Sequence, residues 1–152
     1  MDRSVTHATF SLERRYPVPA AQVFAAWADP AAKASWFASG PTSHQLDFRV
    51  GGQETTRGGP PGGPAMTFES FYRDIVSGER IIYSSTLSAD DDVATVSVTT
   101  VEFEPADGGT RLLLTEQATF LDGREEPAWR EHGTGEWLDA LGAYLREDPP
   151  RS

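Results

Sequence analysis

The chain has 152 residues, which suits one domain with a single core, and 38% of them are hydrophobic. Its 23 acidic residues outnumber its 13 basic ones, and the net charge of -10 argues against binding to nucleic acids or anionic membranes, which depends on Lys and Arg. The absence of cysteine excludes disulfides, thiol nucleophiles and Cys-ligated zinc. Because no segment resembles a secretory signal or a membrane-spanning helix, we expect a soluble, cytoplasmic protein in which residues 1–152 form one domain.

The N-terminal part predicts one strand followed by two short helices. Residues 7–16 alternate in polarity, which is typical of a strand. Residues 20–28 carry apolar side chains at helical spacing. A second helix is expected to start at Asp29-Pro30, with the Asp29 side chain as its cap and Pro30 at its first position, and to end with Trp36 and Phe37.

The rest of the chain predicts six more strands and one long helix. Pairs of Gly and short Gly/Pro/Asp runs separate alternating segments, as hairpin turns do. One of these runs, at residues 58–64, has the composition of a hairpin tip, and its functional interpretation is a lid at the mouth of a cavity. The final helix carries Trp137, Leu138, Leu141 and Leu145 on one face. The predicted strands cover residues 44–50, 53–57, 66–76, 79–88, 93–104 and 109–120, and the helix covers 126–146.

This order predicts an α+β fold in which a curved antiparallel sheet of about seven strands closes over a long C-terminal helix. Motifs along almost the whole chain resemble those of the START-like (SRPBCC) superfamily, within it the bacterial branch similar to the C-terminal domain of the activator of the ninety-kilodalton heat-shock-protein ATPase. The resemblance implies a helix-grip fold with a cavity between sheet and last helix. The motifs are YPVPAAQVFAAWADP at 16–30, WF at 36–37, DFRVGG at 47–52, ERIIY at 79–83, VEFEP at 101–105, GTRL at 109–112 and LDALGAYL at 138–145.

Strand alternation identifies the side chains expected to face this space. Leu46, Phe48 and Val50 share one face of their strand. Two strands give conflicting alternation: Phe68 and Tyr72 oppose Phe71 and Ile75 on residues 66–76, and Val96 and Val98 are out of phase with Val101 and Phe103, which a bulge near residues 99–100 would reconcile. The predicted ligand-binding residues are Trp36, Phe48, Phe68, Tyr83, Leu114, Glu116, Phe120, Trp137 and Leu141.

Glu116 is the polar exception on an apolar strand face, which it shares with Leu112, Leu114, Ala118 and Phe120. A buried carboxyl there would act as an acid, a base or a ligand anchor, and the alternative is a structural carboxylate satisfied by a neighbouring arginine or hydroxyl. His44 shares a strand face with Leu46 and Phe48; it is expected at the surface, with a functional position on that face as its alternative. His132 is expected on a solvated helix face, with the lining of an entrance as its alternative.

We therefore expect binding of a small hydrophobic or amphipathic molecule, lipid-like, aromatic or polyketide-like, with no cofactor and no metal site. One alternative is a cyclase-like or hydrolase-like enzyme that uses Glu116 as acid or base, the one candidate catalytic residue. The other is a co-chaperone-like module that binds a protein partner, as the family resemblance implies. The edge strand of the sheet also makes a homodimer an expectation.

Overall fold

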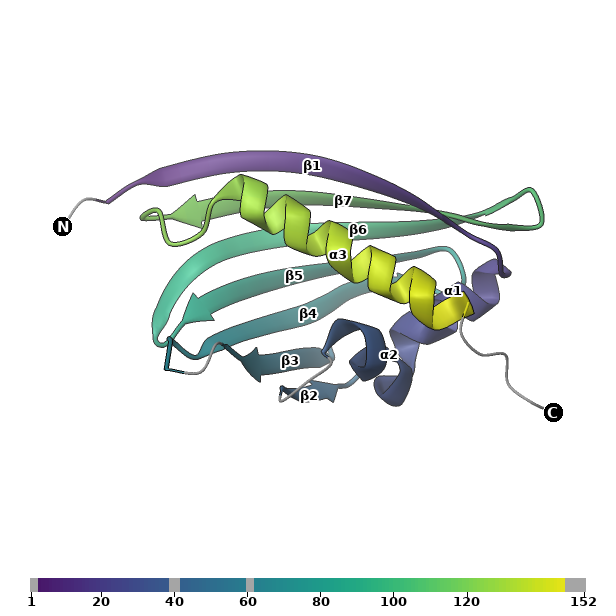
Figure 1. The fold of residues 1–152 in the computed structure, drawn as a ribbon, viewed down its shortest axis with the longest axis horizontal. Helices are drawn as coiled ribbons and strands as arrows, with labels where there is room; N and C mark the ends of the chain where they lie inside the picture. Colours follow the sequence, from purple (N-terminus) through teal and green to yellow (C-terminus); the bar gives the residue numbers. More distant parts are fainter. Residues whose placement is uncertain (1–2, 39–41, 60–61, 147–152) are drawn as a thin grey trace.

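The computed structural model describes residues 3–38, 42–59 and 62–146, and within them the chain forms seven strands and three helices (Figure 1). The order of strands and helices is the predicted one. The elements are β1 (Val5–Tyr16), α1 (Ala20–Ala28), α2 (Pro30–Phe37), β2 (Ser43–Leu46), β3 (Gln53–Gly58), β4 (Met66–Val76), β5 (Arg80–Ala89), β6 (Asp92–Ala106), β7 (Gly109–Leu121) and α3 (Pro127–Arg146).

All seven strands belong to one antiparallel sheet, in the order β1-β7-β6-β5-β4-β3-β2. Each strand from β2 to β7 pairs with its neighbour in sequence. The first strand, β1, pairs with the last strand, β7, along its whole length. α3 lies across one face of the curved sheet, with α1 and α2 near its C-terminal end (Figure 1). The predicted α+β helix-grip fold is confirmed.

The start of α2 has the predicted cap. Asp29 adopts an extended backbone, and its Oδ2 accepts a hydrogen bond of 2.9 Å from the amide of Ala32. Pro30 occupies the first helical position, where its missing amide hydrogen costs nothing. This turn fixes the direction in which α2 leaves α1 and therefore the side of the sheet that α2 covers.

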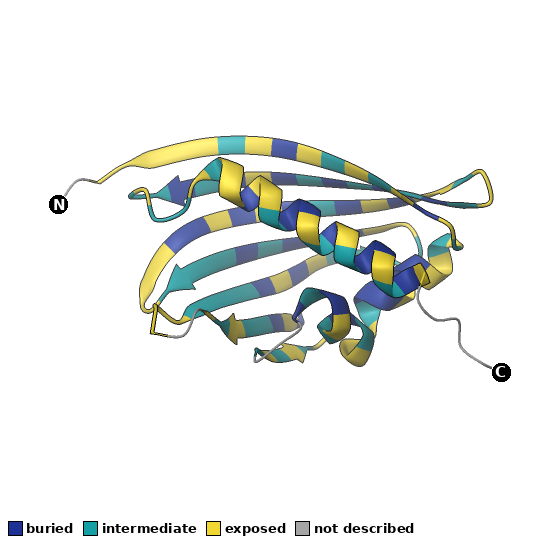
Figure 2. Cartoon of the chain, viewed as in Figure 1, coloured by how far each residue is buried: buried dark blue, intermediate teal, exposed yellow. Residues whose placement is uncertain are grey.

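Alternating burial along the strands places the core between the sheet and α3 (Figure 2). The inner face of α3 carries Leu138, Leu141 and Leu145, all buried. The Tyr16 hydroxyl donates a 2.8 Å hydrogen bond to the Leu138 carbonyl, which ties β1 to the helix. A Cβ at Gly142 would lie only 3.2 Å from the Tyr16 ring, so glycine permits this close approach.

The structure resolves the two conflicts of alternation. On β4 the register with β5 shifts between Tyr72 and Asp74, and this bulge lets both Tyr72 and Ile75 contribute to the core while Phe71 faces outward. On β6 the bulge predicted near residues 99–100 is wrong. The register shift lies instead where Leu87 and Ser88 of β5 meet the start of β6.

The face of β6 turned away from α3 therefore carries Val96 and Val98, which are 44% and 41% exposed, while Ser97 and Thr99 face inward. Between residues 96 and 99 the polarity of β6 is the reverse of the usual arrangement, whereas Val101 and Phe103 further along face inward as usual. The inward hydroxyls of Ser97 and Thr99 contact a buried charged cluster described below, which is why the alternation of apolar residues on this strand was in conflict.

The predicted strand over residues 44–50 is also too long. β2 ends at Leu46, and a tight turn follows in which the amide of Gly52 donates to the Arg49 carbonyl at 2.7 Å. Val50 lies in this turn and is exposed, so its predicted inward position is wrong, whereas Phe48 packs against the core. Across the described ranges, no helix has the length and apolarity needed to cross a membrane.

Candidate functional site

Two adjoining cavities lie beside α3, and Phe68 of β4 and Trp137 of α3 line both. The larger measures about 230 Å³ and the smaller about 110 Å³. The larger is lined by Phe37, Thr42, Thr56, Gly58, Gly59, Met66, Phe68 and Trp137. The smaller is lined by Phe68, Leu87, Glu125, Trp129, Arg130, Gly133, Thr134 and Trp137.

Aromatic rings form the wall that the cavities share. The Trp137 ring centroid lies 4.4 Å from that of Phe37 and 5.9 Å from that of Phe68. These tilted contacts come from three elements, α2, β4 and α3, so a movement of any one changes the shared wall. Of the run at residues 58–64 that the sequence suggested as a lid, Gly58 and Gly59 line the larger cavity, and residues 60–61 lie outside the described residues.

A buried cluster of charged groups adjoins the smaller cavity. Arg130 of α3 donates from Nε to Glu116 Oε2 at 2.8 Å and from one terminal nitrogen to Glu125 Oε1 at 3.0 Å. Its other terminal nitrogen donates to Ser97 Oγ at 3.2 Å, and Thr99 donates to Glu116 Oε1 at 3.3 Å. The guanidinium also lies 5.4 Å from the centroid of the Phe68 ring. One cation thus meets two carboxylates beside an aromatic wall.

Glu116 has the inward position that alternation on β7 predicted, and its residue exposure is 3%. Burial raises the pKa of its carboxyl above 4.5, and the neighbouring Glu125 charge adds to this, although Arg130 and Thr99 act in the opposite direction. The arginine partner and the raised pKa occur together. Pairing with an arginine does not lower the pKa of Glu116 here, because desolvation is the larger effect.

A second buried cluster joins α2 to β3, and the sequence did not predict it. The Lys33 ammonium lies 3.0 Å from both carboxylate oxygens of Glu54, and the Tyr72 hydroxyl donates to the same carboxylate. His44 Nε2 lies 2.7 Å from Glu54 Oε2, and its side chain is only 5% exposed, so the expected surface position of His44 is wrong. The short strands β2 and β3 lie under α2 here, which buries all of these groups.

The other predicted site residues fall into two groups. Phe68 and Trp137 line both cavities. Trp36 and Tyr83 belong to the buried core, Phe48 packs against it, and the Trp36 indole donates to the Ala26 carbonyl at 3.0 Å. Three others, Leu114, Phe120 and Leu141, are almost completely buried, at 1%, 2% and 0% exposure. His132 is 77% exposed and 3.4 Å from Glu136, as expected for a solvated helix face.

Arg130, Thr56 and Glu125 are site residues that the sequence reasoning missed. A signal existed for Arg130, because it precedes Thr134, Trp137, Leu138 and Leu141 at helical spacing and so lies on the inner face of α3. Thr56 lies in a strand whose sequence shows no apolar alternation, and Glu125 lies in the loop before α3. Among the described residues, no cluster of three or more His, Asp or Glu side chains suits a metal ion.

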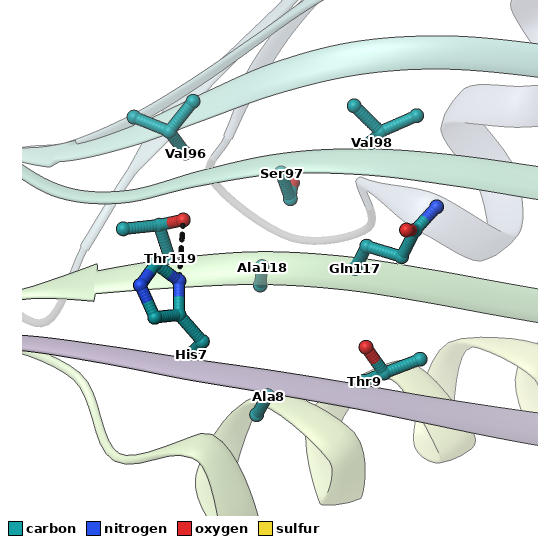
Figure 3. A pocket seen from close by; sticks show the side chains of 9 residues that line it. All are labelled: His7, Ala8, Thr9, Val96, Ser97, Val98, Gln117, Ala118 and Thr119. Atoms are coloured by element: carbon teal, nitrogen blue, oxygen red, sulfur yellow. Dashed lines mark hydrogen bonds between the residues drawn. The ribbon is translucent and has the colours of Figure 1, made fainter.

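The opposite face of the sheet also carries a hollow, of about 370 Å³, across β1, β6 and β7 (Figure 3). The side chains that line it include Val96, Val98, Gln117, Thr119 and His7. His7 Nδ1 lies 3.3 Å from Thr119 Oγ1. This is a solvated strand surface with short polar and apolar side chains. Unlike the smaller cavity beside α3, its lining holds no buried ion pair.

The fold and the cavities beside α3 define a protein in which a sheet grips its last helix around a partly enclosed apolar space. The chain belongs to the family described as activator of Hsp90 ATPase homolog 1-like protein, whose model matches residues 17–146. This confirms the resemblance to START-like proteins. No curated protein matches this chain.

Solved structures of bacterial proteins share the fold over nearly the whole chain. An uncharacterized protein from Rhizobium leguminosarum is 38% identical with a TM-score of 0.93, covering 97% of this chain and 100% of that one. Mll3558 from Rhizobium loti is 41% identical with a TM-score of 0.89, covering 93% and 99%. CV1439 from Chromobacterium violaceum is 26% identical with a TM-score of 0.74, covering 92% and 99%.

Proposed function

We propose that this protein binds a small amphipathic molecule in the cavities beside α3. The observation that carries the proposal is that two adjoining cavities share an aromatic wall of Phe68 and Trp137, with buried Arg130 at one end. Small-molecule sites are typically concave and apolar with a few fixed polar groups, and this site has that composition. START-like proteins generally bind ligands in this space, which agrees with the proposal.

The size of the cavities limits the ligand. The larger measures about 230 Å³, below the roughly 300–1,000 Å³ of most drug-sized sites, so a single fused ring system or a short chain is the best match. A larger ligand requires Trp137 to separate from Phe68, which would join the two spaces. Ring contacts of this kind contribute only about 0.5–1.5 kcal/mol each, so a ligand that replaces them with its own ring offsets that cost.

The enzyme alternative depends on Glu116. Burial raises the pKa of Glu116, which is the direction that a general acid needs, but its carboxylate is held by Arg130 and Thr99, and proton transfer to a ligand would require it to leave one of them. The co-chaperone alternative depends on the family description alone. Binding without catalysis is therefore the function we put forward.

The test has two steps: a ligand that the purified protein retains is identified, and the Phe68 ring that lines both cavities is then removed by substitution. Native mass spectrometry of protein purified from its own host should detect a bound small molecule. Fatty acids, flavonoids and aromatic polyketides are then screened by tryptophan fluorescence and thermal unfolding, where a ligand at 100 times its Kd stabilises the protein by about 2.7 kcal/mol. The proposal would be contradicted if mass spectrometry detects no bound small molecule and no compound of the panel changes the fluorescence or the melting temperature. A protein partner that copurifies would favour the co-chaperone alternative.

Phe68→Ala is the variant that localises the binding. It removes the ring shared by both cavities, so affinity for any ligand found above should fall at least tenfold, which is about 1.4 kcal/mol and within the range of a lost aromatic contact. Phe71→Ala is the matched control, because Phe71 lies on the same strand, faces away from α3 and is 40% exposed. Equal effects of the two variants would place the ligand elsewhere.

A further inference from the structure

The Thr56 hydroxyl is a buried polar group without a hydrogen-bond partner. In the described part of the chain, two buried side-chain polar atoms lack a partner: Thr56 Oγ1 and Trp27 Nε1. Trp27 lies in the core, 1% exposed, whereas Thr56 lines the larger cavity. The Thr56 oxygen itself has almost no accessible surface, so a ligand in the cavity reaches it once neighbouring side chains in the wall shift slightly. A buried hydroxyl is costly unless something bonds to it, and this position in a cavity wall points to such a ligand as its partner.

The strand register shows where this hydroxyl lies. Thr56 of β3 pairs with His44 on β2 and with Phe68 on β4, and residues directly opposite in an antiparallel sheet point to the same face. Since His44 and Phe68 both face the space under α2 and α3, Thr56 does too. It therefore lies in the floor of the cavity, between the Phe68 ring and the His44–Glu54 contact.

The chemistry around Thr56 determines which ligand fits. The described lining of the larger cavity has no charged side chain: it combines the apolar side chains of Phe37, Met66, Phe68 and Trp137 with the hydroxyls of Thr42 and Thr56 and the backbone of two glycines. The nearby charges of Lys33 and Glu54 neutralise each other. A charged ligand group would lose its hydration without gaining an ionic partner, whereas a hydroxyl or carbonyl group can donate to or accept from Thr56.

We infer that Thr56 is a specificity-determining residue that selects planar apolar ligands bearing one neutral hydroxyl or carbonyl group. This inference rests on the proposed function, since it names the ligand class for the same cavity. The hydroxyl holds the polar end of the ligand at β3, and the apolar body lies against Phe68 and Trp137.

The experiment uses a matched pair of probes, 2-naphthol and naphthalene, with affinities measured by isothermal titration calorimetry. The wild-type protein should prefer 2-naphthol. Thr56→Val keeps the shape but removes the hydroxyl, so affinity for 2-naphthol should fall about tenfold while affinity for naphthalene stays the same or rises. Thr56→Ser, which keeps the hydroxyl, should retain the preference.

Thr55→Val is the control on the same strand. Thr55 faces the other side of the sheet and accepts a 3.2 Å hydrogen bond from Gln53 Nε2, so its loss should not change the preference between probes. The melting temperature of Thr56→Val should equal or exceed that of the wild type, because an unpaired buried hydroxyl has been removed. A lower melting temperature would show that the hydroxyl has a structural partner and would overturn the inference.

Two further outcomes would overturn it. If both probes bind but Thr56→Val affects them equally, the hydroxyl is satisfied by water and does not select the ligand, while the proposed function stands. If neither probe binds the wild-type protein, the inferred ligand class is wrong. The retained-ligand experiment, which does not depend on these probes, then decides the proposed function separately.

Discussion

Two buried ion pairs stabilise different parts of this molecule and differ in how their carboxylates are satisfied. Lys33–Glu54 joins α2 to β3, and Arg130–Glu116 joins α3 to β7. Glu54 has three donors, because Tyr72 and His44 contact it in addition to Lys33. Its pair has no second carboxylate, so the charges balance.

The second pair has the opposite balance. Glu116 shares Arg130 with Glu125, whose Oε1 also accepts from Thr95, so two carboxylates compete for one cation. The pKa of Glu54 falls to about 2, although burial alone would raise it, because Lys33, His44 and Tyr72 together favour the charged form. The pKa of Glu116 rises, because burial is the larger effect there.

The contrast shows that an ion pair does not by itself fix the charge state of a buried carboxyl. The number of donors and the presence of a second carboxylate decide the sign. Lys33 carries a cost too, since burial lowers the pKa of its ammonium despite Glu54. The Lys33–Glu54 pair therefore acts as a structural anchor whose partners depend on each other, whereas burial favours the protonated form of Glu116.

The largest expected effect comes from breaking the anchor. Lys33→Met leaves the Glu54 carboxylate buried without its cation, and removing one partner of a buried pair typically costs about 3–5 kcal/mol. The variant also loses the ammonium contact with the Phe37 ring, 4.4 Å from its centroid. Urea unfolding at pH 7 measures the loss in unfolding free energy.

The double variant Lys33→Met with Glu54→Gln is the control. It removes both charges, so it should be less destabilised than Lys33→Met alone. A loss below about 1 kcal/mol for the single variant would mean that Tyr72 and His44 suffice to hold the carboxylate, and the difference between the two clusters would then not be structural.

Acid should remove the next largest contribution. Because the folded pKa of Glu54 is about 2, below its ordinary value of 4.5, the folded state binds fewer protons, and this stabilisation is complete above pH 4.5 and lost as the pH falls toward 2. The shift corresponds to roughly 3 kcal/mol. Urea unfolding of the wild type between pH 6 and pH 2.5 should show this loss, and Glu54→Gln should give a flatter profile over the same range. Parallel profiles would contradict the assignment.

The two clusters also show how much the sequence predicts. The order of strands and helices along the chain follows from the sequence patterns, and the helix-grip fold follows from the family resemblance. The inward position of Glu116 also follows, because β7 alternates apolar side chains over its whole length and a period of two fixes the face. The Lys33–Glu54 pair does not follow. β3 reads QETTRG, which has no apolar alternation, and Lys33 lies among alanines in a short helix.

Burial of the first cluster is a tertiary effect. It depends on α2 covering β2 and β3, which brings together His44, Glu54 and Tyr72 with Lys33, and no local pattern encodes that. For β6 the pattern left the inward face open, because the inward residues Ser97 and Thr99 are polar and contact Arg130 and Glu116. Buried polar networks reverse the rule on which alternation depends.

The smallest expected effect, and the sharpest test of the contrast, is Glu116→Gln. The amide keeps an oxygen for Arg130 but carries no charge to desolvate, so unfolding free energy at pH 7 should stay within about 1 kcal/mol of the wild type or increase. The same substitution at Glu54 should destabilise the protein.

The stability of the Glu116→Gln variant should also depend on pH in a defined direction. Because a raised folded pKa means that the wild type gains stability as the pH falls toward 4.5, any advantage of Glu116→Gln should shrink over that range. Carboxyl NMR titration of the wild type should place Glu116 above 4.5. A pKa below 4.5 together with a loss of about 1–3 kcal/mol would show that Arg130 outweighs burial, and the two pairs would then be of one kind.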